Sequence, residues 1–301
     1  MRRRHIKSSA KNPLPPRYHT KYYFNYMIPK LFAFDLDGTL LDSQKRISRA
    51  NITALREMDE AGAKIALASG RLGSSIERYL PELGIDAALL TLNGAQIFTD
   101  LKDGRRCIYS AELDNRYANQ LIDYCTDKPV ALNYYYRGNL FTVKTKKNAV
   151  WAELYYQQTK TVCNLLDDFS EMADNLPSKI ILVGDSSYIN ELEREFRSLW
   201  DENSVYICRS WNHYLEFLSP KANKGIGLEV LCKALGVNMR DAAAFGDEQN
   251  DIPMLKLAGL GIAMKNSPQE VKIFAKRVTE KTNDEDGIAC EWERMKRDLL
   301  M

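Results

Sequence analysis

From Leu31 onward, short apolar runs alternate with longer segments of helical periodicity. Leu31–Phe34 and Lys64–Ala68 are apolar runs of strand length, and the segment between them places its apolar residues on one helical face. Ser48 is suited to cap that helix at its start, and Gly62 is suited to end it. Because strands that alternate with helices usually pair in parallel, the pattern predicts an α/β fold with a doubly wound parallel sheet.

The same alternation returns in the last third of the chain, whereas the middle has a different character. Further strands are expected at 88–92, 242–245 and 260–263, and further helices at 72–80, 224–235, 252–258, 268–275 and 288–299. Between about Gln96 and Asn212, Tyr and Phe are more frequent, and 130–136 faces 140–144 across Arg137-Gly138-Asn139, a hairpin pattern. We therefore expect a core formed by residues 27–95 and 213–301, with an inserted α+β domain at 96–212.

The formal net charge of +2 is the sum of two unlike parts. Residues 1–30 carry eight Lys or Arg and no acidic residue, whereas the other 271 residues carry 34 basic and 40 acidic ones. Residues 1–26 form a basic leader without apolar periodicity, which we expect to be disordered. The leader lacks the apolar stretch of a secretory signal, and Met27 is an alternative start of the chain. The mildly acidic body argues against nucleic acid as a partner.

Other compositional features exclude several classes of protein. No apolar run approaches the ~18–20 residues that cross a bilayer, so no membrane partner is expected. The six cysteines are far apart and form no Cys-x-x-Cys or Cys/His pattern, which disfavours a zinc site and favours reduced thiols in a cytoplasmic protein. Only His213, of the three histidines, lies outside the leader, so Ser-His or Cys-His catalysis is disfavoured. We interpret His213 as a packing residue.

Two carboxylates directly follow the first strand, in Asp35-Leu36-Asp37-Gly38-Thr39. Open α/β sheets bind ligands at the carboxyl ends of their strands, and Gly38 allows the backbone to bend so that both carboxylates serve one site. An EF-hand calcium loop is excluded, because its Gly is sixth and its Glu twelfth, whereas here Gly38 is fourth and Arg46 twelfth. A surface Asp-x-Asp that arose by chance remains an alternative for this motif alone.

Three further polar segments stand at helix starts. Gly246-Asp247-Glu248-Gln249-Asn250-Asp251 and Ala68-Ser69-Gly70-Arg71 each follow a predicted strand, and Lys224 opens the helix 224–235. Taken singly, such acidic residues are often helix caps, and a lone Lys is usually a solvated charge. Together the segments supply oxygen ligands for a divalent cation, a hydroxyl and amides for phosphoryl oxygens, and a fixed positive charge. Phosphoryl transfer needs these groups.

This set of motifs resembles the haloacid dehalogenase superfamily of aspartyl-phosphate phosphatases, in particular its Cof-type branch with a type IIB cap. The resemblance covers nearly all of the chain after Met27, with Asn93-Gly94-Ala95 and 283–287 as further family-like stretches. The 34 residues from Asp35 to Ser69 are too few for a cap at that point. The 155 residues from Ser69 to Lys224 are enough, so the inserted α+β domain would be the cap on a Rossmann-like core.

The resemblance implies a two-step reaction that depends on Mg²⁺. Asp35 would attack the phosphorus and form an aspartyl-phosphate, while Asp37 would act first as general acid and then as general base. Asp35, Asp247 and the backbone carbonyl of Asp37 would hold the cation. The groups that would bind the phosphoryl oxygens or orient the phosphoryl group are Ser69, the amides of Leu36 and Gly70, Lys224 and Asn250. The supporting residues would be Thr39, Arg71 and Asp251, with Asp251 acting through Lys224 or the metal ligands.

The implied activity is that of a Mg²⁺-dependent phosphatase, a phosphoric monoester hydrolase. Its substrates would be small phosphorylated metabolites, such as sugar phosphates or phosphorylated cofactors. Two alternatives remain open: a phosphomutase on the same fold, and a non-catalytic module that binds phosphorylated metabolites. The intact motifs argue against the second alternative. The identity of the substrate, the cap residues that contact it and the oligomeric state do not follow from the sequence.

Overall fold

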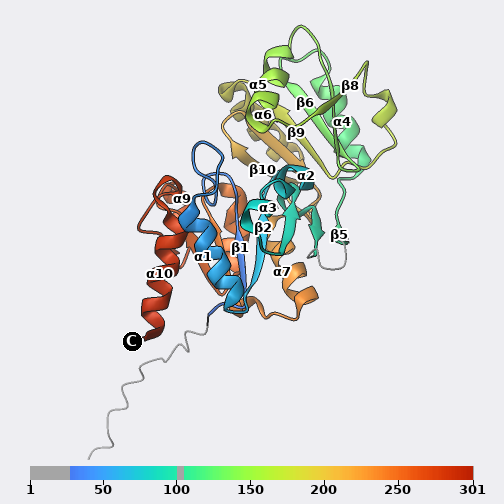
Figure 1. Cartoon of the computed structure of the whole chain (residues 1–301). Helices are drawn as coiled ribbons and strands as arrows, with labels where there is room; N and C mark the ends of the chain where they lie inside the picture. The colour runs from blue at the N-terminus through green and yellow to red at the C-terminus, as the bar shows by residue number, and fades with distance from the viewer. Residues whose placement is uncertain (1–27, 100–104, 301) are drawn as a thin grey trace, which may run out of the picture.

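The computed structural model describes residues 28–99 and 105–300, and it consists of a core with a cap stacked on it (Figure 1). The basic leader at 1–26 lies outside the described residues. The core sheet has eight strands in the order β14-β13-β12-β1-β2-β3-β4-β5. These strands are β1 (Leu31–Phe34), β2 (Lys64–Ala68), β3 (Ala87–Thr91), β4 (Gln96–Phe98), β5 (Cys107–Ser110), β12 (Ala242–Gly246), β13 (Leu260–Ala263) and β14 (Arg277–Val278).

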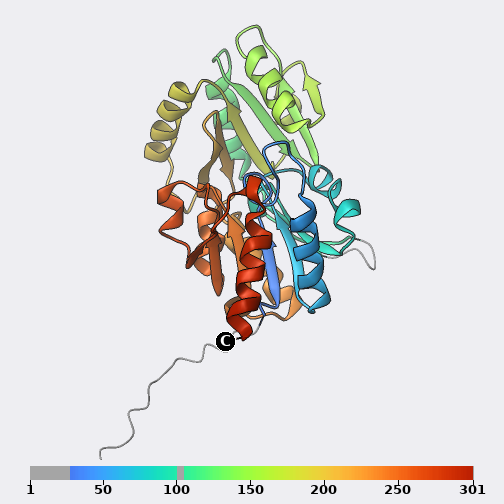
Figure 2. The same cartoon turned by 60° about the vertical axis from the view of Figure 1, so that its left-hand side comes forward.

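Helices cover both faces of the core sheet, as predicted for a doubly wound fold. The strands from β14 to β3 are parallel, and the chain order reverses between β1 and β12. α1 (Arg49–Glu60) and α10 (Gly287–Leu300) pack on one face, and α7 (Lys224–Leu235) and α8 (Ile252–Leu257) on the other (Figure 2). β1 is apolar along its whole length because both of its faces are covered. Among the described residues, no helix has the length and apolar character that crossing a membrane requires.

Local signals in the sequence placed several of these elements correctly. The strands at 31–34, 64–68 and 260–263 and the helix 224–235 are confirmed, and the Ser48 side chain caps α1 by accepting from the Asn51 N–H. The single helix expected at 72–80 was wrong, because the chain forms α2 (Gly73–Glu77) and then α3 (Leu80–Leu83). Pro81 lies in the first turn of α3, where its missing N–H costs no helical hydrogen bond, and so it begins a helix there. The helix expected at 268–275 is shorter, as α9 (Gln269–Lys272).

The cap is a six-stranded sheet in the order β10-β11-β9-β6-β7-β8, with helices packed against it. Its elements are α4 (Asn115–Cys125), β6 (Ala131–Tyr136), β7 (Asn139–Val143), α5 (Ala149–Thr159), β8 (Cys163–Leu166), β9 (Lys179–Val183), α6 (Ser186–Leu199), β10 (Tyr206–Trp211) and β11 (Tyr214–Leu218). The predicted hairpin is confirmed as β6–β7. α4 and α6 cover one face of the sheet, and the other face packs with core residues such as Leu72 and Leu92. The cap therefore lies directly over the segments that follow β2 and β3.

The strand pairing corrects the boundaries that the sequence suggested for the cap. Gln96 begins β4, which pairs antiparallel with β3 and extends the core sheet through β5 to Ser110. At the other boundary, β11 pairs with β9 and β10, so the cap sheet continues to Leu218 rather than ending at Asn212. β4 pairs antiparallel with both β3 and β5, and this pattern resembles the antiparallel pairing of the cap strands.

Candidate active site

The predicted site residues meet at the carboxyl ends of three adjacent core strands. Asp35 follows β1, Asp247 follows β12 on one side of it, and Ser69 follows β2 on the other side. The strand order reverses between β1 and β12, which is where open α/β sheets bind ligands. Gly38 has a φ of +78°, and a Cβ there would lie 2.2 Å from Asp247 Oδ2. Only glycine allows the turn after β1 to approach Asp247 so closely.

A buried lysine joins two of the acidic residues. Lys224 Nζ donates to Asp35 Oδ1 at 2.5 Å and to Asp251 Oδ1 at 2.6 Å, and the Lys224 side chain has no exposed surface. Asn223 caps α7 by accepting from the Ile226 N–H, and this cap fixes Lys224 as the first residue of the helix. The expectation that Lys224 is a fixed charge rather than a solvated one therefore agrees with its position.

Burial and mutual repulsion govern the titration of the acidic residues. Burial, only partly offset by Lys224, raises the pKa of Asp35 from 3.8 to about 7. Burial and the neighbouring Asp35 and Asp251 charges raise the pKa of Asp247 well above its ordinary value. Although burial opposes its charge, Asp251 and Asp35 raise the pKa of Lys224. One positive charge thus lies among three carboxylates.

The acidic residues fit a hard divalent cation. Carboxylate oxygens of Asp35, Asp247 and Asp251 all lie within 4.8 Å of one another. Asp251 already uses both of its oxygens, because Oδ1 accepts from Lys224 and Oδ2 accepts from the N–H groups of Asp247 and Glu248. Asp35 and Asp247 are therefore the better ligands, and Asp251 holds the loop and Lys224 in position. Thr39 Oγ1 donates to Asp247 Oδ1 at 2.9 Å and orients that carboxylate.

The Asp37 side chain contacts two cations. Arg71 donates to both of its oxygens, each at 2.6 Å, and Lys45 Nζ lies 2.6 Å from Oδ1. Against the effect of burial, these two cations lower the pKa of Asp37 from 3.8 to about 2. The sequence motifs indicated Arg71 as a supporting residue, whereas Lys45 belongs to none of them. The loop after β1 brings Lys45 back toward Asp37, and no local pattern indicated that return.

The segments expected to bind phosphoryl oxygens lie beside the carboxylates. Ser69 is buried, and its Oγ accepts from the Arg71 N–H at 3.2 Å. Leu36 lies in the tight turn after β1, where its carbonyl accepts from the N–H groups of Thr39 and Leu41. Asn250 Nδ2 donates to Asn93 Oδ1 at 2.9 Å. Asn93 is fully buried, and the sequence marked it as family-like without giving it a role.

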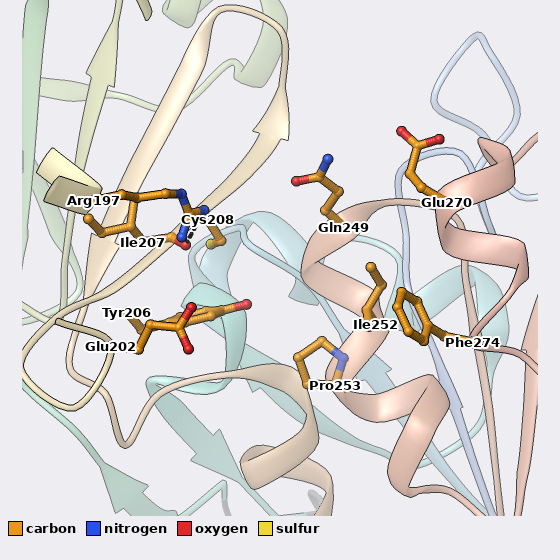
Figure 3. Close-up of a pocket in the computed structure, with 10 residues that line it drawn as sticks. All are labelled: Arg197, Glu202, Tyr206, Ile207, Cys208, Gln249, Ile252, Pro253, Glu270 and Phe274. Carbon is orange, nitrogen blue, oxygen red and sulfur yellow. Dashed lines mark hydrogen bonds between the residues drawn. The ribbon is translucent and has the colours of Figure 1, made fainter. Parts of the chain in front are cut away.

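Two adjoining clefts separate the cap from the core. One, of about 680 Å³, has Arg209, Trp211 and His213 on the cap side and Glu248 and Gln249 on the core side. His213 Nδ1 lies 3.0 Å from the Gly184 carbonyl oxygen, and its ring stacks on Trp151. A smaller cleft, of about 340 Å³, shares Gln249 with the first (Figure 3). Its walls face each other across the gap: the cap side is Arg197, Glu202, Tyr206, Ile207 and Cys208, and the core side is Gln249, Ile252, Pro253, Glu270 and Phe274.

Comparisons with known proteins agree with this geometry. Residues 32–291 match the family model of haloacid dehalogenase-like hydrolases. A protein of Haemophilus influenzae named as a putative phosphatase is 31% identical over 87% of this chain and 97% of its own length. The 5-amino-6-(5-phospho-D-ribitylamino)uracil phosphatase YitU of Bacillus subtilis is 29% identical over 87% of this chain and 95% of its own length.

The cap type is also found among solved structures. A subclass IIB sugar phosphatase of the same superfamily superposes with a TM-score of 0.76, covering 90% of this chain and all of that one at 24% identity. That likeness concerns the fold, including the cap placed between the two parts of the core. The chain therefore belongs to the haloacid dehalogenase-like hydrolases, in the Cof-type branch with a type IIB cap, and is a phosphoric monoester hydrolase.

Proposed function

We propose that the protein is a Mg²⁺-dependent phosphatase of small phosphorylated metabolites that works through an aspartyl-phosphate. The observation that carries this proposal is the convergence of Asp35, Asp247, Lys224 and Ser69 at the carboxyl ends of β1, β12 and β2. A carboxylate nucleophile, a second carboxylate, a cation and a hydroxyl are the groups that hydrolysis through a covalent intermediate requires.

Asp35 is the nucleophile in this proposal. It forms a bond to phosphorus as the ester oxygen leaves, and water then cleaves the resulting aspartyl-phosphate. Lys224 holds the attacking carboxylate through Oδ1 and places its positive charge where the phosphoryl oxygens gather. The buried Asp251 fixes Lys224 from the opposite side, so that the ammonium group does not follow Asp35 during the reaction.

Asp37 is the general acid and then the general base. With Arg71 and Lys45 on its carboxylate, Asp37 stays ionised and is a poor proton donor. Binding of the ester must therefore loosen at least one of these contacts before Asp37 can carry a proton to the leaving oxygen. Because Lys45 is exposed on its loop and Arg71 is mostly buried, Lys45 is the contact that is easier to exchange.

The carboxylates of Asp35 and Asp247 and the backbone carbonyl of Asp37 would hold Mg²⁺. When bound, the cation offsets the repulsion between the nucleophilic carboxylate and the anionic ester. Ser69, the amides of Leu36 and Gly70, Lys224 and Asn250 would bind or orient the phosphoryl group. Thr39, Arg71 and Asp251 support these residues through the hydrogen bonds described above.

The cap and the relatives support the proposed substrate class. The cap covers the segments after β2 and β3, which limits access to the site and favours metabolites over folded proteins. The relative from Bacillus subtilis is named for a phosphorylated metabolite. We expect sugar phosphates or phosphorylated cofactors as substrates, in the cytoplasm, without nucleic acid or membrane partners.

Hydrolysis in ¹⁸O-labelled water tests the proposal against its alternatives. The purified protein is incubated with Mg²⁺ and a panel of phosphate monoesters, and the products are analysed by mass spectrometry. Inorganic phosphate that carries the label is the expected result. Transfer of the phosphoryl group to another hydroxyl without labelled phosphate would indicate a phosphomutase. Tight binding of an ester without any product would indicate a binding module.

A further inference from the structure

Two charged side chains of the cap are buried where the cap meets the core. Lys179 of β9 and Glu216 of β11 are each 1% exposed, and Lys179 Nζ lies 2.9 Å from Glu216 Oε2. Burying such a pair is costly unless further hydrogen bonds satisfy both groups. The additional hydrogen bonds of both side chains include contacts with the core, close to the proposed phosphoryl site.

We propose that Lys179 and Glu216 are positioning residues for phosphoryl transfer, an inference that rests on the proposed function. Through them the cap holds the turn Ser69-Gly70-Arg71 and the side chain of Asn250. In this arrangement the cap does more than enclose the leaving group. It supplies part of the framework that places the phosphate-binding groups of the core.

Lys179 acts on the turn through the carbonyl of Gly70, which accepts from Lys179 Nζ at 2.5 Å. The other two carbonyls of the turn are held by the core, because Ser69 O accepts from the Asn93 N–H and Arg71 O from the Leu92 N–H. All three carbonyls are thus fixed, and the cap provides the partner of the middle one. Without Lys179, the Gly70 carbonyl loses this partner, and the peptide between Gly70 and Arg71 is free to change its orientation.

The hydrogen bond from Lys179 to the Gly70 carbonyl also affects the Ser69 hydroxyl. The peptide that carries Gly70 O also carries the Arg71 N–H, which donates to Ser69 Oγ. A cation on the carbonyl polarises the peptide and strengthens this N–H as a donor. Because Ser69 Oγ accepts from the Arg71 N–H, its own proton remains available for a phosphoryl oxygen. Lys179 therefore helps to set the direction in which Ser69 donates.

Glu216 reaches the second phosphate-binding segment through Asn93. Glu216 Oε2 accepts from Asn93 Nδ2 at 2.8 Å, and Asn93 Oδ1 accepts from Asn250 Nδ2 at 2.9 Å. Ser210 donates to the other Glu216 oxygen, so that this carboxylate is held on both sides. A continuous series of hydrogen bonds thus runs from Lys179 through Glu216 and Asn93 to Asn250.

The test is a double variant, Lys179→Met with Glu216→Gln, which removes both charges together and leaves no unpaired buried ion. Two constants are measured: the KM for para-nitrophenyl phosphate, and the Kd for inorganic phosphate with Mg²⁺ by calorimetry. We expect both to rise roughly tenfold or more, the usual scale for residues that orient binding groups. The single variant Glu216→Gln keeps an oxygen for Lys179 and Asn93, and we expect a smaller rise.

Thr142→Val is the matched control within the cap. Thr142 is buried in β7 and donates to the Leu132 carbonyl, with both residues in the cap sheet. We expect this variant to lower the melting temperature and to leave the KM and the phosphate Kd unchanged. A purely structural role for the Lys179–Glu216 pair would give the same pattern in the double variant.

A double variant with unchanged KM and phosphate Kd, whatever its melting temperature, would overturn the proposal. If the double variant does not fold, Glu216→Gln decides in the same way: raised constants support the proposal and unchanged constants overturn it. Wild-type protein without hydrolytic activity would contradict the proposed function instead. The phosphate Kd would still test the positioning role, because its measurement requires no turnover.

Discussion

Asp35, Asp247 and Asp251 bring three carboxylates together around the single ammonium group of Lys224. The raised pKa values mean that burial and repulsion outweigh the attraction of Lys224 at Asp35 and the Thr39 hydrogen bond at Asp247. The crowded carboxylates therefore destabilise the folded protein, as is common where catalytic groups lie close together. A divalent cation between Asp35 and Asp247 would relieve that strain.

Replacing Asp35 with Asn removes one of the repelling charges. Because the pKa of Asp35 is about 7 when folded and near its ordinary value of 3.8 when unfolded, its ionisation costs stability. The protonated form stabilises the fold fully at low pH, and this contribution is lost as the pH rises through 7. We expect Asp35→Asn to raise the urea midpoint in EDTA, by more at about pH 8 than at about pH 5. An equal rise of the midpoint over the wild type at both pH values would contradict the raised pKa.

Sequence patterns indicated site residues that directly follow strands, but they did not indicate residues that reach the site from a returning loop or from the cap. Asp35, Ser69 and Asp247 were found because each comes directly after a buried strand. Lys45 was missed because its loop returns to Asp37 only in three dimensions. Lys179 and Glu216 carried one available signal: each is a charged residue in an otherwise apolar strand, which indicates a buried partner.

Helices and strands whose ends are marked by local sequence features were predicted correctly, whereas the sheet to which a strand belongs depends on long-range pairing and was not. The helix predicted at 224–235 is confirmed as α7, and the structure shows that both of its ends, the Asn223 cap and Gly236, are local features. The place of β4 could not be predicted, because its membership of the core sheet depends on pairing with β3. The segment just before β4, which carries Gly94, also contacts the start of α7 and so affects the position of Lys224.

Gly94 gives a direct test of that contact. Its φ is +86°, and an added Cβ would lie 2.4 Å from the Asn223 carbonyl oxygen at the start of α7. Gly62 is the matched control, because its φ is +89° and nothing lies within 4 Å of its added Cβ. We expect Gly94→Ala to lower the free energy of unfolding by about 1–3 kcal/mol more than Gly62→Ala does. Chemical denaturation measures both losses, and equal losses would show that α7 tolerates the displacement.

The whole molecule is a core that carries the reacting groups and a cap that is inserted between two parts of that core. The sequence predicted this arrangement from its alternating strands and helices and from the distance between Ser69 and Lys224. It did not predict where the cap sheet begins and ends, since β4, β5 and β11 are assigned only by their partners. In our account, binding of Mg²⁺ and phosphate stabilises the molecule as one unit, because the site is connected to both domains.

We expect Mg²⁺ to raise the melting temperature of the whole protein, because it binds the folded site and not the unfolded chain. Protons compete for Asp35 and Asp247, so the rise should be larger at about pH 8 than at about pH 5. Asp247→Asn should abolish the rise, whereas Asp174→Asn, at an exposed position in the cap, should keep it. Differential scanning fluorimetry measures these shifts, and an unaltered rise in Asp247→Asn would exclude Asp247 as a ligand.

The role of Asp35 as nucleophile is tested by the turnover of Asp35→Asn with Mg²⁺ and an aryl phosphate, measured beside the wild-type protein. Asn cannot form the acyl-phosphate bond, so we expect kcat to fall by roughly a thousandfold or more. The circular dichroism spectrum should be unchanged. Wild-type activity should also be lost in EDTA and restored by added Mg²⁺. Turnover of the variant within a few-fold of the wild type would exclude Asp35 as the nucleophile, and full wild-type activity in EDTA would exclude a required metal ion.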